Sequence, residues 1–297
     1  LGVYGIARDL AAAGVGELVN KDKKEISVSK EKFPIFLDYK NKDDACSIFS
    51  GRIIKNVKNT KSPEWLVNKL EAIGLRSVNC LVDITNYINF DKGRPLHVYD
   101  LKKISKKIGA RSSKKGEEIQ ALDGKNYKLD NEMCVIADDE KVLGIGGIMG
   151  GEDSGSSMST TEIFLESAYF DPVKTAITGR KLNIMSDSRY RFERGVDPEY
   201  VLEGLEYATS LIIELCGGSA GEISVIDNRK FVNEKINFKP ELVREMTGLK
   251  IDNKIIHKIL TSLGFKVSKD WEITIPSWRP DISINEDIVE EVVRIYG

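Results

Sequence analysis

The chain has 297 residues, of which 41% are hydrophobic and 30% are charged, and its formal net charge at pH 7 is −2. This composition is typical of a soluble globular protein with room for two modest domains. It excludes the strongly basic overall charge that marks many nucleic-acid-binding proteins, although a local basic patch would suffice for such binding.

The sequence contains no run of about 18 apolar residues, so we expect no membrane-spanning helix. Its four cysteines are scattered without CxxC or Cys/His spacing, which argues against a zinc site and favours reduced thiols in a cytoplasmic protein. The chain begins without Met inside an amphipathic segment and stops just after an acidic helix. We therefore expect it to be a piece of a larger protein.

The elements of the first two thirds of the chain are predicted from periodicity and from breaker residues. Ser62 is expected to cap a helix that has Pro63 in its first turn and ends at Gly74. The predicted elements are a helix over 1–18, a charged linker or edge over 20–32, a strand over 45–57, a helix over 63–73, a hairpin at Asp123-Gly124, strands over 141–149 and 161–170, a helix over 171–182 and a longer helix over 197–216.

The last third of the chain predicts a small separate module after a polar stretch at 226–234. Its elements are a strand over 235–238, helices over 240–247 and 253–263, strands over 265–267 and 271–275, and a helix over 284–296. Short helices with a hairpin are typical of a winged-helix-like module. We predict an α+β fold with mixed sheets, and three parts: a helix over 1–18 left from a preceding domain, a main domain over 19–226 and the small module over 227–297.

Six glycines fall between residues 144 and 155, in the segment VLGIGGIMGGEDSG. Glycine lets a ligand approach the backbone closely, so this segment could form the wall of a pocket. Its spacing is neither GxGxxG before a helix nor GxxxxGK[ST], which disfavours a nucleotide-phosphate loop. A simple tight turn is the other interpretation.

Two polar side chains in the main domain are candidates for a site. His97 follows Thr85 and Asn86 in the segment 82–100, although a single histidine is more often structural than catalytic. Glu166 follows three apolar residues in a predicted strand. A carboxylate in such a strand must be paired or must bind something. Pairing with a nearby arginine and contact with a ligand are both open for Glu166.

The segment SDSRYRFERGVDP at 186–198 interleaves arginines with acidic residues. Arginine presents a rigid fork of donors suited to carboxylates, so we expect paired guanidiniums here rather than a nucleic-acid patch. A network of this kind costs stability unless its geometry is fixed, which indicates that it holds a neighbouring part of the chain in place. The residues concerned are Arg189, Arg191, Glu193 and Arg194.

The C-terminal segment carries five acidic residues against one arginine between 281 and 297. Helical spacing places Asp287, Glu290 and Glu291 on one face, with Asp281 just ahead of the helix. Carboxylates that converge without compensation repel one another unless a cation lies among them, and oxygen ligands suit Mg²⁺ or Ca²⁺. A solvated acidic face, or a face that docks on a basic partner, explains the same pattern.

Several segments together resemble one known family. They are VDITNYINFDKGRPLHVYDLKKI (82–104), GIGGIMGGEDS (144–154), IFLESAYFDP (163–172), SRYRFERGVDP (188–198) and IPSWRPDISINEDIVEEVVRIYG (275–297). In this order they resemble the beta subunit of bacterial phenylalanyl-tRNA synthetase, and the opening LGVYGIARDLAAA resembles the helix before its editing region. The resemblance covers nearly the whole chain.

This resemblance implies a function. The family's beta subunit carries an editing site that hydrolyses Tyr wrongly attached to tRNA(Phe), while the alpha subunit of an alpha2-beta2 enzyme uses ATP and joins Phe to tRNA. The chain would hold the editing module and the next module, and would not ligate alone. The resemblance also implies Mg²⁺ shared with the alpha subunit, at Asp281, Asp287, Glu290 and Glu291.

Carried over residue by residue, the resemblance implies an editing pocket at Thr85, Asn86, His97, Gly146, Gly147, Gly150, Glu166, Ser186 and Ser188. Glu166 with the glycine backbone would recognise the hydroxyl of Tyr. His97, Thr85 and Asn86 would position the ester and a water molecule. Ser186 and Ser188 stand where members of the family often carry Thr and Ala. Behind them, the arginine segment would support the edge of the pocket.

A second interpretation is a non-catalytic module that docks the alpha subunit and tRNA. A concave pocket at the glycine-rich loop beside Glu166 and His97 would favour the enzyme. A filled turn, with Glu166 in an ion pair with an arginine, would favour the docking module. Residues 227–297 carry 12 basic and 12 acidic side chains, which argues against strong DNA binding by that module.

Overall fold

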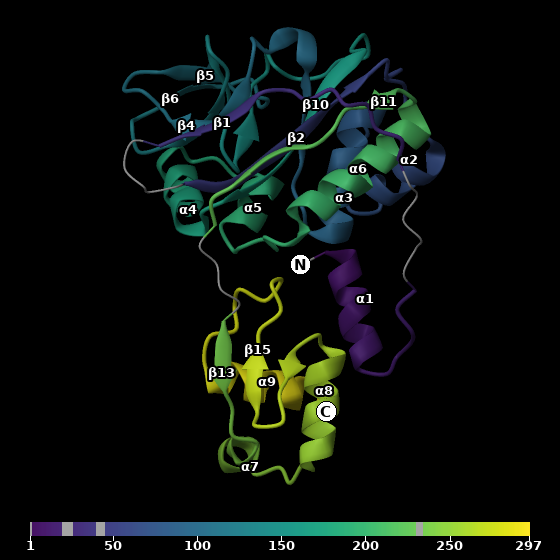
Figure 1. The fold of residues 1–297 in the computed structure, drawn as a ribbon, viewed down its shortest axis with the longest axis vertical. Helices are drawn as coiled ribbons and strands as arrows, with labels where there is room; N and C mark the ends of the chain where they lie inside the picture. The colour runs from purple at the N-terminus through teal and green to yellow at the C-terminus, as the bar shows by residue number, and fades with distance from the viewer. Residues whose placement is uncertain (1, 20–25, 40–44, 230–233) are drawn as a thin grey trace. The chain divides into compact units, whose positions relative to one another are not determined.

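The computed structural model describes residues 2–19, 26–39, 45–229 and 234–297. These residues form two compact units (Figure 1). The larger unit comprises the described residues between 26 and 229, and the smaller unit combines residues 2–19 with 234–297. Part of the linker expected at 20–32 lies outside the described residues. The functional division at 18 and 226 stays a prediction.

The larger unit is built from two five-stranded sheets, a two-stranded hairpin and five α-helices within its described residues. Its strands are β1 (Ile35–Asp38), β2 (Cys46–Lys55), β3 (His97–Asp100), β4 (Ile108–Ser112), β5 (Glu118–Gln120), β6 (Asn126–Lys128), β7 (Cys134–Ala137), β8 (Val142–Ile145), β9 (Met149–Gly150), β10 (Glu162–Phe170), β11 (Ser219–Ala220) and β12 (Ser224–Asp227). Its helices are α2 (Glu64–Glu71), α3 (Cys80–Lys92), α4 (Pro172–Lys181), α5 (Asp187–Phe192) and α6 (Tyr200–Cys216), with a 3-10 turn at Leu101–Lys103.

The first sheet has the order β11-β2-β10-β3, with β12 also paired to β2, and all its pairs are antiparallel. The second sheet has the order β1-β4-β7-β8-β9, in which β1 and β4 run parallel and the other neighbours antiparallel. Strands β5 and β6 form the hairpin expected at Asp123-Gly124. Antiparallel and parallel pairing with separate helices confirms the predicted α+β class.

Strand β10 lies between β2 and β3 and divides the core of the larger unit. Because successive side chains of a strand point to opposite faces, β10 contributes to two layers. Ile163 and Leu165 pack with apolar residues of α3 and α6, which lie side by side in Figure 1. Phe164 and Ala168 pack with residues of β4, β7 and β8 from the second sheet. Alternation places Glu166 on this second face, between the two sheets.

The predicted elements omit one helix of the larger unit and are wrong at two other positions. Residues 80–92 form helix α3, which no amphipathic pattern announces because both apolar and polar side chains of this helix are buried. Its ends do carry signals, since Asn79 caps the Val82 amide and Gly93 adopts a left-handed conformation. The strand expected at 141–149 is broken by a turn into β8 and β9. Ser62 does not cap α2, because its hydroxyl donates to Oδ2 of Asp83 at 2.6 Å.

The smaller unit follows its predicted elements to within two residues from 235 onwards. It contains α1 (Val3–Ala12), β13 (Lys235–Asn237), α7 (Glu241–Thr247), α8 (Asn253–Ser262), β14 (Lys266–Val267), β15 (Glu272–Thr274) and α9 (Asn285–Tyr296). Its strands form an antiparallel sheet in the order β13-β15-β14. The apolar faces of α8 and α9 meet over this sheet, and α1 contacts α8. In neither unit is any described helix long and apolar enough to cross a membrane.

Gly51 of β2 pairs with Glu166 of the neighbouring strand β10, and a substitution there tests this packing. A methyl group at Gly51 would lie 2.3 Å from Cζ of Phe164 and 2.6 Å from the backbone oxygen of Leu165. Because a backbone atom cannot move aside alone, we expect Gly51→Ala to lower the free energy of unfolding by about 2–3 kcal/mol. Urea unfolding measures this change. Gly155→Ala is the control, because its nearest atom lies at 3.4 Å. Equal stability of the two variants would contradict the packing described here.

Candidate active site

The site is centred on Glu166, which lies in the middle of β10 with only 6% of its surface exposed. The strand register places it opposite His97 of β3 and Gly51 of β2. Within the described residues it forms no ion pair, and its single hydrogen bond comes from the hydroxyl of Tyr99, which donates to Oε2 at 2.7 Å. Burial raises the pKa of Glu166 to about 7, and the bond from Tyr99 opposes this rise.

His97 and Tyr99 share a face of β3 because they are two residues apart. Their rings meet edge to face, with centroids 4.4 Å apart. Tyr99 is fully buried, and burial followed by the charge of Glu166 raises its pKa well above the ordinary value. Burial lowers the pKa of His97 to about 4, so its imidazole is neutral at pH 7. The Nε2 atom of His97 is shielded from water and has no hydrogen-bond partner among the described residues.

Two glycines of the second sheet lie against the rings of His97 and Tyr99. Gly144 and Gly150 are paired across β8 and β9. A methyl group on Gly150 would lie 2.3 Å from Cε1 of His97, and one on Gly144 would lie 3.7 Å from the hydroxyl of Tyr99. The absence of a side chain at Gly150 is therefore what allows the imidazole of His97 to lie against the β8–β9 hairpin.

The other two predicted glycines serve the turn itself. Gly146 is buried, and a methyl group on it would lie 2.6 Å from Sγ of Cys134. Gly147 has a positive φ of 71° and packs on the ring of Phe170. Neither presents an exposed backbone. Among the three glycines proposed for the pocket, Gly150 is the one whose missing side chain makes room for another proposed residue, His97.

Ser186 and Ser188 fasten this turn from α5. The hydroxyl of Ser186 donates to the backbone oxygen of Ile148 at 2.6 Å, and that of Ser188 donates to the oxygen of Gly147 at 3.2 Å. Ser186 also caps α5 by accepting from the amide of Arg189. Both hydroxyl protons are thus used to hold the glycine turn, so neither serine adds a free donor to a pocket.

The arginine segment forms the paired network expected from its sequence. Arg189 donates from Nε to Glu193 at 2.9 Å and packs against Gly179 of α4. Arg194 pairs with the same carboxylate at 2.8 Å. Arg191 lies 3.7 Å from Asp187 and over the ring of Phe90 at 4.3 Å. These contacts join α5 to α4 and to the end of α3.

Thr85 and Asn86 lie on α3, whose apolar residues pack on the Ile163 and Leu165 face of β10. The hydroxyl of Thr85 donates to the backbone oxygen of Val82 at 2.7 Å, which satisfies it within the helix. In the described part of the chain, neither residue forms a hydrogen bond with Glu166 or His97. The structure therefore does not bring Thr85 and Asn86 into the cluster around Glu166.

The expectation of an uncompensated acidic cluster at the C-terminus is wrong. Arg279 binds both oxygens of Asp281 and both oxygens of Glu291, and Arg294 also pairs with Glu291. Asp287 accepts from the amides of Ser283 and Ile284 and so caps α9. Glu290 is exposed to solvent. Among the residues described here, no three acidic, His or Cys side chains form a group that could hold a metal ion, so these four residues do not fit Mg²⁺ in this arrangement.

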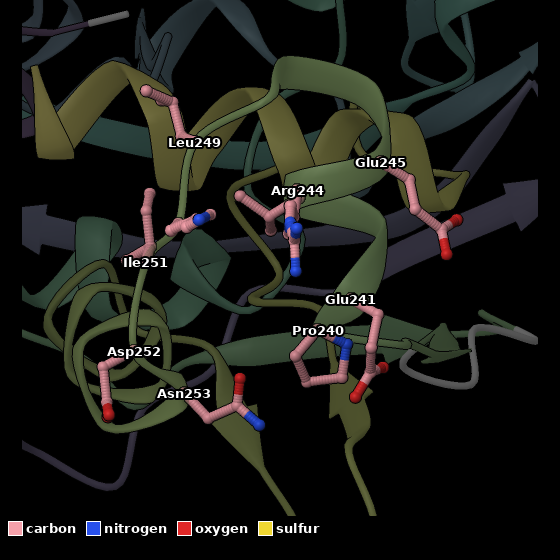
Figure 2. Close-up of a pocket in the computed structure, with 10 residues that line it drawn as sticks. Pro240, Glu241, Arg244, Glu245, Leu249, Ile251, Asp252 and Asn253 are labelled. Atoms are coloured by element: carbon pink, nitrogen blue, oxygen red, sulfur yellow. The ribbon is translucent and has the colours of Figure 1, made fainter.

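A groove of about 720 Å³ lies in the smaller unit and contains none of the proposed site residues. Figure 2 shows Glu241, Arg244 and Glu245 on α7, beside the loop that carries Leu249 and Ile251. Its charged residues are of both signs, so it presents no uniform field to a charged ligand.

Comparison with known proteins identifies the family. Residues 45–217, more than half of the chain, match the B3/4 domain. The chain belongs to the B3/4 domain family. Residues 236–297 match the tRNA synthetase B5 domain. These two matches fall in the larger and the smaller unit respectively.

Two relatives that cover nearly the whole chain are beta subunits of phenylalanine–tRNA ligases. The chain is 45% identical over 298 residues to the phenylalanine–tRNA ligase beta subunit of Mesorhizobium japonicum, covering 99% of this chain and 37% of that protein. It is 47% identical over 301 residues to the beta subunit of Rhodopseudomonas palustris, again covering 37% of the relative. The chain thus spans little more than a third of the length of these relatives.

One solved structure is also similar. The crystal structure of an N-terminal fragment of the phenylalanyl-tRNA synthetase beta subunit from Pyrococcus horikoshii is 17% identical, with a TM-score of 0.47. The match covers 99% of this chain and 82% of that one. This similarity is too low to support an argument about the site of the B3/4 domain.

The residues predicted from the sequence do not include Tyr99 and Gly144, which lie in the candidate site around Glu166. Tyr99 stands two residues after His97, so strand alternation could have placed both on one face. Gly144 is one of six glycines in its segment, and the sequence does not distinguish it from the others. Its pairing with Gly150 depends on the break between β8 and β9, which the sequence pattern did not indicate.

The raised pKa of Glu166 predicts a pH-dependent stability. Its folded-state pKa of about 7 exceeds the ordinary 4.5, so the folded protein keeps a proton that the unfolded chain releases. Stability from this group is therefore lost as pH rises from about 4.5 to about 7. We expect Glu166→Gln, which cannot ionise, to gain about 3 kcal/mol relative to wild type between pH 4 and pH 8.

Denaturant unfolding at several pH values measures this difference. The lowered pKa of His97 gives the opposite slope between about 4 and 6.5, but it is present in both proteins and cancels in the comparison. A difference that stays constant with pH would show that Glu166 titrates normally.

Proposed function

We propose that this chain is part of the beta subunit of a phenylalanine–tRNA ligase and that its B3/4 domain hydrolyses Tyr-tRNA(Phe). The relatives that cover the whole chain support the first part. The observation that carries the second part is the buried carboxylate of Glu166, which has no cationic partner among the described residues and lies opposite His97. Perturbed ionisable groups of this kind are concentrated at functional sites.

Recognition of the substrate rests on Glu166. Its Oε2 is taken by Tyr99, whereas Oε1 accepts no hydrogen bond from the described residues. The phenol of a tyrosyl group can donate to Oε1, and the side chain of Phe cannot. A site built to bond a hydroxyl discriminates strongly, because the wrong substrate leaves a buried polar group without its partner.

Hydrolysis in this proposal uses a positioned water molecule. The water oxygen forms a bond to the ester carbonyl carbon, the bond to the ribose oxygen of the tRNA breaks, and a water proton passes to that ribose oxygen. His97 has a pKa of about 4 and is a weak base at pH 7, so its role in this proposal is to orient the water or the ester rather than to take a proton. No covalent intermediate is required.

The whole enzyme adds functions that lie outside this chain. We propose an alpha subunit as partner, in an alpha2-beta2 assembly in the cytoplasm that binds tRNA(Phe) and uses ATP and Mg²⁺ for aminoacylation. The match to the tRNA synthetase B5 domain supports a place in such an assembly. Since the four C-terminal carboxylates do not fit Mg²⁺ as they are arranged here, no step of the editing reaction is assigned to a metal.

The alternative of a non-catalytic docking module is favoured by one feature and disfavoured by another. Gly146 and Gly147 lie in a filled turn, as this alternative predicts. It predicted Glu166 in an ion pair with an arginine, and the hydrogen bond from Tyr99 occupies that place instead. Hydrolysis of Tyr-tRNA(Phe) by the wild type, together with the altered preference or rate expected of the variants below, separates the two functions.

Removing the carboxylate should reduce the preference of the enzyme for one substrate over the other. We expect Glu166→Ala to lower the preference for Tyr-tRNA(Phe) over Phe-tRNA(Phe) by about 10- to 100-fold, since one charge-assisted hydrogen bond is lost. Deacylation of both substrates by the alpha–beta enzyme measures the preference as a ratio of kcat/KM values. Unchanged preference would overturn the role of Glu166.

Removing the imidazole should slow hydrolysis and leave the preference intact. We expect His97→Ala to deacylate Tyr-tRNA(Phe) about 100-fold more slowly, because the water or the ester loses its positioning group. His257→Ala is the matched control, since His257 is exposed on α8 of the smaller unit. A normal rate in His97→Ala would show that His97 is only structural.

A further inference from the structure

We propose that Tyr99 is a positioning residue that determines specificity, because it holds Oε2 of Glu166 and leaves Oε1 to receive the phenol of the substrate. This inference rests on the proposed editing function and deepens it. Nothing in the sequence pattern assigned a role to Tyr99. Its hydroxyl is the single donor to Glu166 within the described ranges.

The geometry of the pair follows from the register of two strands. His97 lies directly opposite Glu166, and Tyr99 lies opposite Phe164. Tyr99 is therefore the diagonal neighbour of Glu166 on the same face, which is within reach of an aromatic side chain. A one-residue change of register would turn Glu166 to the other face and break the contact.

The ring of Tyr99 has little freedom to move. It is 1% exposed and lies against the ring of His97 at 4.4 Å and that of Phe164 at 6.5 Å, measured between centroids. The backbone of Gly144 lies close to its hydroxyl, where a methyl group would be 3.7 Å away. A buried phenol must also keep a hydrogen-bond partner. Tyr99 therefore presents its hydroxyl at one fixed point.

This fixed donor orients the carboxylate. A carboxylate that accepts at Oε2 cannot rotate without losing a charge-assisted bond in an environment poor in water. The remaining oxygen then points in one direction, and a substrate phenol that donates to it meets an acceptor that is already in place. Orientation before binding is what converts a hydrogen bond into discrimination between substrates.

The same bond also controls the charge of Glu166. The titratable groups that surround it are His97 and Tyr99 of β3 and Cys134 of β7, while β2 offers Gly51 and the β8–β9 hairpin offers glycines. His97 is neutral at pH 7, and burial raises the pKa of the Cys134 thiol to about 12, so neither carries charge there. Tyr99 alone lowers the pKa of Glu166 against its burial.

Tyr99→Phe removes the hydroxyl and keeps the ring. We expect the preference for Tyr-tRNA(Phe) over Phe-tRNA(Phe) in the wild-type alpha–beta enzyme to rise with pH through a midpoint near 7, as Glu166 ionises. In Tyr99→Phe the midpoint should move upward by about one pH unit, so the preference should fall about fivefold at pH 7 and recover to within about twofold at pH 8.5. Deacylation between pH 6 and 8.5, corrected for spontaneous hydrolysis, measures both profiles.

Tyr127→Phe is the matched control. Its hydroxyl also donates to a carboxylate, Oδ2 of Asp123 at 2.7 Å, but on the exposed β5–β6 hairpin. We expect its pH profile to equal that of the wild type. If Tyr99→Phe also keeps the wild-type midpoint and preference, the proposal is wrong, because a merely structural loss would lower both rates without moving the midpoint.

A titration of this chain labelled with ¹³C at the glutamate carboxyl carbons separates the two levels of the proposal. Glu166→Gln identifies the signal of Glu166, and Tyr99→Phe should raise its midpoint. An unmoved midpoint overturns the positioning role even if editing is confirmed. If the wild-type enzyme releases no Tyr, the proposed function fails and the specificity role fails with it, while a moved midpoint would still establish that Tyr99 controls Glu166.

Discussion

The hydrogen bond from Tyr99 to the buried carboxylate of Glu166 is the interaction on which the site depends. Burial of a carboxylate disfavours its charged form, and here no cation among the described residues offsets that penalty. The bond exists because β10 and β3 pair in one register, with Glu166 opposite His97. The register is in turn determined by the apolar residues of β10, which must face α3 and α6 on one side and the second sheet on the other.

The second sheet contributes to the site through two positions that carry no side chain. Gly144 and Gly150 face each other across β8 and β9 and leave room for the rings of Tyr99 and His97. The turn between these strands is held by the hydroxyls of Ser186 and Ser188, and the arginine pairs of α5 hold that helix against its neighbours. Each layer restricts the next, so the position of the His97 ring depends on contacts that reach as far as α4. Catalysis by positioning requires side chains that are held in one geometry in this way.

The carboxylates of the C-terminal segment and the carboxylate of Glu166 differ in how their negative charge is compensated. At the end of the smaller unit, Arg279 and Arg294 surround Asp281 and Glu291, and Asp287 caps a helix, so those carboxylates stabilise local structure. Glu166 is left with a neutral partner, and its pKa rises to about 7. A carboxylate that a protein buries without a cation costs stability, which makes it the stronger candidate for a role in binding.

The sequence by itself determined the α+β class, the elements of the smaller unit and the unusual status of Glu166, because periodicity, capping residues and a carboxylate within an apolar strand are local signals. Only the tertiary structure decided the partner of that carboxylate, because Tyr99 and Glu166 are 67 residues apart and meet through strand pairing. It also decided that residues 80–92 form a helix with buried polar as well as apolar side chains, that Ser186 and Ser188 hold a turn, and that Arg279 compensates the acidic segment. A local sequence pattern indicates that a side chain, such as a carboxylate in an apolar strand, is unusual for its position. Packing between segments distant in the sequence decides which residues that side chain contacts.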